Sequence, residues 1–87
     1  MNKHVEDRDL PKMPKVEKGV YRHYKGKLYR VDGVCLHTET LEPLVVYTPL
    51  YESTVNYWVR PYAMFTEMVD IDGEQVPRFQ KIEDSLK

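Results

Sequence analysis

The chain has 87 residues, of which 41% are hydrophobic and 31% are charged, with 13 Lys or Arg side chains against 14 Asp or Glu. This length leaves room for one small domain, and the net charge of -1 excludes a global positive field that would draw the protein onto nucleic acid or an anionic membrane. Cys35 is the single cysteine, which excludes an intramolecular disulfide framework and favours the reducing cytoplasm.

Polar segments begin and end the chain. Residues 1–18 carry five basic and four acidic side chains and two prolines. Such a segment buries too little apolar surface to offset its loss of conformational entropy, so we expect a disordered or loosely docked leader. We expect a polar tail over residues 81–87 and one folded domain over residues 19–80. The longest purely apolar run, residues 44–47, is too short to span a bilayer.

The first expected element is a β-hairpin. Residues 19–31 alternate aromatic and basic side chains around a tight turn at Lys25 and Gly26. Turn residues between two runs of strand-favouring residues predict a strand over residues 20–24 that pairs with a longer strand over residues 28–37. The hairpin gathers four cations and three tyrosines without an acidic side chain.

Two residues interrupt the second of these strands. At Asp32 and Gly33 the apolar positions change phase, which predicts a β-bulge. With the bulge, four side chains would face the same side of the sheet: Tyr29, Val31, Val34 and Leu36. We therefore expect one continuous apolar face along this strand.

Prolines and polar loops separate the next two strands. The connection over residues 37–43 precedes a third strand over residues 44–50. A loop over residues 52–56 precedes a fourth strand over residues 57–60, which Pro61 ends.

Beyond the fourth strand the pattern changes. Residues 62–65 predict one helical or 3₁₀ turn that lays Met64 and Phe65 on the core. An Asp-rich turn then predicts a second hairpin, which pairs residues 67–70 with residues 76–80. This hairpin carries four carboxylates, which we interpret as a solvated turn opposite in charge to the first hairpin: Glu67, Asp70, Asp72 and Glu74.

These elements favour an all-β fold. Five to six short strands with one helical turn before the last hairpin predict a small SH3-like barrel. Closure of the barrel would remove the exposed edges of an open sheet. An OB-type barrel is the nearest alternative, but it usually has longer strands and a larger helix.

The residues of these elements resemble a bacterial family of unknown function, DUF1653. The motifs are G-x-Y-R-H-Y-K-G-x-x-Y from Gly19, H-x-E-T from His37, V-V-Y ending at Tyr47, L-Y ending at Tyr51, W-V-R-P from Trp58, Phe65, and R-F from Arg78. The resemblance covers nearly all of residues 19–79. It implies an SH3-type β-barrel in a small bacterial protein, and it supplies no activity, cofactor or catalytic residue.

Aromatic and basic side chains form the candidate binding surface. Trp58 and Arg60 are two positions apart in a strand and therefore share a face. If Tyr57 and Val59 fill the core, Trp58 and Arg60 are exposed and available to a ligand. If Trp58 lies in the core, Arg60 needs a carboxylate partner, with an acidic residue of the 37–43 connection as the candidate.

Seven residues are the ligand-binding candidates: Arg22, His23, His37, Glu39, Tyr47, Trp58 and Arg60. They favour a non-enzymatic binding or adaptor module for a protein, a peptide or a small polar ligand. Single-stranded nucleic acid is an alternative, because its binding proteins use rings beside cations, although the net charge counts against it. The same aromatic residues would also serve as core and rim alone.

Histidine and cysteine raise two further alternatives. Cys35, His37 and Glu39 alternate in the chain, and His23 on the paired strand could join them around a transition metal. Glu39 is expected in a loop, however, so we predict neither a metal nor another cofactor. A small enzyme, or an enzyme's accessory subunit, acting on a polar metabolite near these residues is the weakest alternative, because no nucleophile is identifiable.

Overall fold

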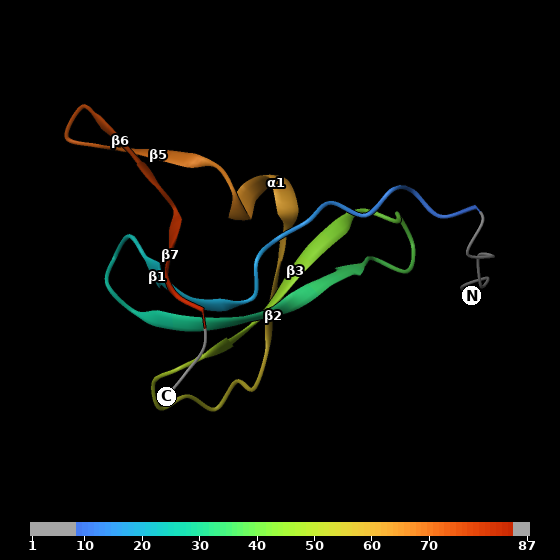
Figure 1. Ribbon diagram of the computed structural model, residues 1–87, viewed down its shortest axis with the longest axis horizontal. Helices are drawn as coiled ribbons and strands as arrows, with labels where there is room; N and C mark the ends of the chain where they lie inside the picture. The colour runs from blue at the N-terminus through green and yellow to red at the C-terminus, as the bar shows by residue number, and fades with distance from the viewer. Residues whose placement is uncertain (1–8, 85–87) are drawn as a thin grey trace.

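The computed structural model describes residues 9–84, so the first eight residues of the predicted leader and the last three of the predicted tail lie outside the described part. The elements are β1 (Gly19–His23), β2 (Leu28–Leu36), β3 (Pro43–Pro49), β4 (Trp58–Pro61), α1 (Tyr62–Phe65), β5 (Met68–Ile71), β6 (Glu74–Pro77) and β7 (Phe79–Glu83) (Figure 1). The prediction of a mostly β chain with little helix is confirmed. No helix among residues 9–84 is long and apolar enough to cross a membrane.

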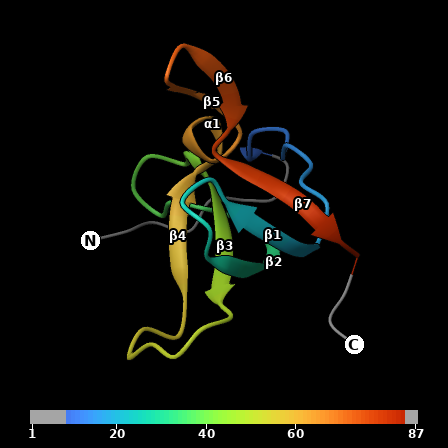
Figure 2. The same cartoon turned by 90° about the vertical axis from the view of Figure 1, so that its left-hand side faces the viewer.

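Five strands form an antiparallel sheet in the order β4-β3-β2-β1-β7, and β5 pairs with β6 in a separate two-stranded sheet. The predicted first hairpin is confirmed, with Tyr21 opposite Tyr29 and Arg22 opposite Leu28. Figure 2 shows β4 and β7 on opposite sides of the larger sheet. Since these two edge strands do not pair with each other, the hydrogen-bonded sheets of residues 9–84 do not close into a barrel.

The predicted bulge is confirmed in β2. The register of β2 against β3 shifts between Val31 and Gly33. Val31 lies opposite Tyr47 and Val34 lies opposite Val45, so side chains before and after the shift face the same side of the sheet. An extra residue at this point bends the strand, which allows one strand to follow the curved core.

The prediction of one continuous strand over residues 76–80 is wrong, because the structure divides these residues between β6 and β7. Arg78 lies between them, and its backbone N–H donates to the Glu67 carbonyl at 3.1 Å while its carbonyl accepts from the Tyr24 N–H at 2.9 Å. These bonds lead the chain from one sheet to the other. β7 then runs to Glu83 and includes the first residues of the predicted tail.

The core lies on the inner side of the larger sheet beneath α1. Its cluster of buried side chains comprises Tyr21, Val31, Val45, Tyr47, Phe65 and Phe79. The Phe65 and Phe79 rings stack with centroids 4.1 Å apart. The prediction that Met64 also packs on the core is wrong, because its side chain is 43% exposed. A single helical turn directs neighbouring side chains in different directions, so Phe65 reaches the core and Tyr62 packs against its border, whereas Met64 points to solvent.

The described end of the predicted leader contacts the domain. Val16 packs against the core cluster. The Tyr21 hydroxyl donates to the Glu17 carbonyl at 2.7 Å, and the Tyr62 hydroxyl donates to the Lys15 carbonyl at 3.2 Å. Two tyrosine hydroxyls therefore hold this extended segment to β1 and α1.

Candidate functional site

Trp58 and Arg60 project from the edge strand β4 onto the core side of the sheet. In the β3–β4 ladder Trp58 lies opposite Tyr47, and Arg60 lies opposite Val45. Both partners are buried, yet Trp58 is 43% exposed because no strand covers the far edge of β4 in the sheet of residues 9–84. Val59 is 53% exposed on the other side, so the alternative in which Tyr57 and Val59 fill the core does not hold. The two candidates therefore lie where the core opens to solvent.

The Arg60 guanidinium lies at the rim of the aromatic core. Its Nε donates to the Tyr47 hydroxyl at 3.3 Å, and its Cζ is 5.8 Å from the centroid of the Phe79 ring. The carboxylate that Arg60 would need if Trp58 were in the core is not found, since the ion pairs among residues 9–84 do not include Arg60. The Arg60 guanidinium thus contacts a hydroxyl and a ring face, and no carboxylate in the described part of the chain pairs with it.

His23 lies beside this guanidinium at the end of β1. Its ring packs against Tyr24, with centroids 4.5 Å apart, and meets Phe79 edge-on at 4.9 Å. Its Nδ1 accepts the Lys25 backbone N–H at 3.1 Å. Burial, followed by the positive charge of Arg60, lowers the pKa of His23 from its ordinary value of 6.5. These surroundings therefore favour the neutral form of the His23 imidazole over the charged form.

Tyr29 and Tyr51 extend the row of aromatic rings that begins with Tyr47 at Arg60. The Tyr29 ring meets Tyr47 and Tyr51 edge-on at 5.2 and 5.4 Å, and the hydroxyls of Tyr29 and Tyr51 are 2.9 Å apart. Burial raises the pKa of the Tyr29 hydroxyl, and the bond to Tyr51 raises it further. The Lys27 Nζ lies 4.2 Å from the Tyr51 ring centroid. A second cation thus borders the same aromatic surface.

Sequence reasoning missed Lys27 and Tyr29 as candidates. The pairing of Tyr21 with Tyr29 across the first hairpin was the available signal for Tyr29, because paired residues share a face. Lys27 lies in the turn before β2, where strand alternation gives no direction for a side chain.

His37 and Glu39 are not brought together with these residues. Both are exposed in the connection after β2, at the opposite end of that strand from the first hairpin turn. The His37 Nδ1 accepts the Glu39 N–H at 3.0 Å and the Thr40 N–H at 3.4 Å, so this imidazole orders its own loop. Among the residues that the structure describes, no group of three or more His, Cys, Asp or Glu side chains could hold a metal ion.

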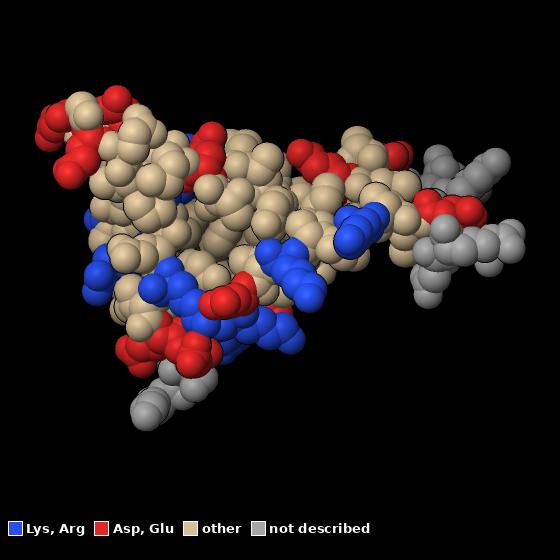
Figure 3. Space-filling view, turned by 45° about the horizontal axis from the view of Figure 1, so that its top comes forward, with Lys and Arg blue, Asp and Glu red and all other residues tan. Residues whose placement is uncertain are grey.

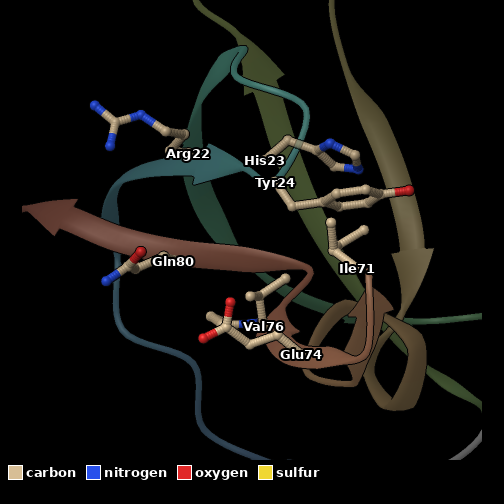
Figure 4. Close-up of a pocket in the computed structure, with 8 residues that line it drawn as sticks. Arg22, His23, Tyr24, Ile71, Glu74, Val76 and Gln80 are labelled. Carbon is tan, nitrogen blue, oxygen red and sulfur yellow. The ribbon is translucent and has the colours of Figure 1, made fainter.

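Arg22 belongs to a separate cleft of about 300 Å³ between the end of β1 and the β5–β6 hairpin. The cleft is lined by Arg22, His23, Tyr24, Ile71, Glu74, Val76, Pro77 and Gln80. Figure 4 shows the Tyr24 ring near Ile71 and the Arg22 guanidinium directed away from both. His23 lines this cleft and also contacts the core, so it is the link between Arg22 and the surface beside Arg60.

Charge is unevenly distributed over the molecule. Carboxylates gather at the projecting β5–β6 hairpin, at the upper left of Figure 3, where Asp70, Asp72 and Glu74 are exposed. Lys and Arg side chains lie lower on the same face, with other carboxylates among them. The cations around His23 therefore form a local positive region in a molecule whose net charge is -1.

Comparison with known proteins agrees with this architecture. A family described as "Protein of unknown function (DUF1653)" matches residues 19–81. A crystal structure of a protein belonging to DUF1653 from Bordetella bronchiseptica is similar with 37% sequence identity and a TM-score of 0.75, over 83% of this chain and 94% of that chain. No curated protein matches. The chain belongs to the DUF1653 family.

Proposed function

We propose that this chain is a non-enzymatic, cytoplasmic binding module with an SH3-like barrel plan. The strand order β4-β3-β2-β1-β7, with one helical turn after β4 and the last strand against the first, supports this plan. The β5–β6 hairpin is then an insertion between α1 and β7. The proposed contact surface centres on Trp58 and Arg60, with the buried Tyr47 holding Arg60 from below. His23 links this surface to the cleft that Arg22 lines.

The observation that carries the proposal is the environment of the Arg60 guanidinium. Its charge is partly removed from water, and among residues 9–84 it has a hydroxyl and a ring face as partners instead of a carboxylate. Removing a cation from water is unfavourable unless an anion compensates for it. Trp58 offers an exposed ring on the same face, two positions away. A ligand with an anionic and an apolar group would satisfy both side chains.

Single-stranded nucleic acid is the second candidate. The Lys27 ammonium over the Tyr51 ring supports it, because a cation beside an exposed ring can meet a phosphate and a stacked base together. The alternative of a small enzyme loses support, because His37 and Glu39 follow the far end of β2 and do not approach His23.

A peptide array tests the proposal with three variants. Trp58→Ala and Arg60→Ala should each lose the peptides that the wild-type protein binds. Tyr57→Ala is the matched control, since Tyr57 is 64% exposed and directly precedes β4. Retention of binding by both Trp58→Ala and Arg60→Ala would overturn the proposed function.

A further inference from the structure

We propose that the ligand is an extended acidic peptide that adds a strand to the free edge of β4. In this arrangement a ligand Asp or Glu lies against Arg60, and an apolar ligand residue two positions away lies against Trp58. The inference rests on the proposed function and names the class of partner.

The free edge of β4 supplies the first argument. β4 is the terminal strand of its sheet and pairs only with β3 among the described strands (Figure 2). In an antiparallel pair, alternate backbone groups point away from the neighbouring strand, so one edge of β4 offers N–H and C=O groups without ladder partners. A polypeptide can pair with these groups by strand addition. Pro61 lacks an N–H, so the usable edge ends at Arg60.

The spacing of side chains supplies the second argument. Trp58 and Arg60 are on the core side of β4, and Val59 is on the other side. Residues on an added strand would alternate in the same way, with directly opposite Cβ atoms about 4.5–5.5 Å apart. The ligand pattern is therefore an apolar residue, any residue, then Asp or Glu, in either chain direction. The middle residue would cover part of Val59, which is 53% exposed.

Charge complementarity supplies the third argument. The Arg78 guanidinium near His23 is paired with Glu67 at 2.6 Å, whereas Arg60 is not in an ion pair within residues 9–84. Lys25 also contributes positive potential at His23. A ligand carboxylate beside Arg60 would form charge-assisted hydrogen bonds with a guanidinium that has no ion-pair partner in the described part of the chain.

A peptide fits these features better than a nucleic acid or a second copy of the chain. A nucleic acid has no backbone groups in strand register, and the net charge of -1 provides no general attraction for its repeated phosphates. A second copy that paired through β4 would bring Trp58, Val59 and Arg60 to the interface and would supply no carboxylate from that strand.

Trp58 is the single tryptophan, so its fluorescence reports directly on the proposed site. The probes are capped hexapeptides Thr-Ile-Thr-Glu-Thr-Val, the same sequence with Gln for Glu, and the Glu peptide with N-methyl groups on alternate amides in both phases. We expect the Glu peptide to bind and the Gln peptide to bind roughly tenfold more weakly or worse. Of the two N-methylated peptides, the one whose methyl groups replace the amide hydrogens directed at β4 should lose binding.

A charge exchange gives a second readout that does not depend on stability. Arg60→Glu should reject the Glu peptide and bind the same peptide with Lys in place of Glu. Amide spectra of each folded variant must match the wild type away from β4. Equal binding of the Glu and Gln peptides, or tolerance of methylation in both phases, would overturn the inference.

The two proposals fail in different ways. If binding requires Trp58 and Arg60 but depends on neither the Glu side chain nor the ligand amides, the proposed function stands and strand addition is overturned. Tighter binding of oligothymidylate than of the Glu peptide would overturn it in favour of nucleic acid. A dimer in sedimentation that Val59→Arg dissociates would overturn it in favour of a second copy.

Discussion

The Nε of Arg60 donates to the hydroxyl of Tyr47 at 3.3 Å, which joins the open edge of the sheet to a core residue that is 4% exposed. The Tyr47 ring also contacts Phe65 and Phe79, with centroids 5.5 and 5.3 Å away. The proposed binding cation is thus positioned by the hydrophobic core itself. Changes at Tyr47 should therefore affect both stability and binding.

Tyr47→Phe keeps the ring and removes the hydroxyl that accepts from Arg60. We expect a loss of about 1 kcal/mol in the free energy of unfolding, the usual net value of one hydrogen bond, measured by urea denaturation. Tyr62→Phe is the control, because its hydroxyl bonds a backbone carbonyl at the surface and should matter less. An unchanged midpoint for Tyr47→Phe would show that the Arg60 bond contributes no stability.

The stacked pair Phe65 and Phe79 should dominate the stability of the core. Phe65→Ala removes a ring that is 2% exposed, so we expect a loss of about 3–5 kcal/mol in the free energy of unfolding. Met64→Ala at the neighbouring position, which is 43% exposed, should change it by less than about 1 kcal/mol. Thermal melts of the two variants compare these effects directly. Similar melting temperatures would contradict the assignment of Phe65 to the core.

Gly19 should be intolerant of any side chain. Its φ is 144°, and an added Cβ would overlap the Glu83 carbonyl oxygen of the neighbouring strand β7. Gly26→Ala is the matched control, since φ there is 114° but an added Cβ would meet open space. Both variants carry backbone strain, so the difference between them isolates the close approach of β1 and β7. We expect Gly19→Ala to be the less stable by about 2 kcal/mol or more in urea denaturation.

Elements with local signals could be predicted from the sequence. The turn at Gly26 indicates the first hairpin, and the change of apolar phase at Gly33 indicates the bulge, because each signal lies within or directly beside the strands it affects. Pro77, the last residue of β6, is a local signal for the division of β6 from β7, but the passage of the chain from one sheet to the other has none. This passage depends on the bond between the Tyr24 N–H and the Arg78 carbonyl, two residues that are distant in the chain.

In the candidate site, too, local features could be predicted from the sequence and contacts between distant residues could not. The alternation of Trp58 and Arg60 gave their shared face, which the register with β3 confirms. The hydrogen bond between Arg60 and Tyr47 could not be predicted, because it depends on the register of β3 against β4, which one sequence does not specify. Spacing alone places His37 on the same face as Cys35, but β2 ends at Leu36, so the alternation of side chains stops before the histidine.

His23 should make stability dependent on pH. Burial and the cations that face it, Arg60 on β4, Arg78 before β7 and Lys25 in the turn, lower its pKa in the folded protein below the ordinary 6.5. Below pH 6.5 the unfolded chain binds a proton more readily than the folded protein, so this contribution to stability is complete above pH 6.5 and is lost as the pH falls. Urea denaturation between pH 5 and pH 8 measures the slope. His23→Gln should flatten it, and His37→Gln, which replaces an exposed histidine, is the matched control. A slope that persists in His23→Gln would assign the effect to another group.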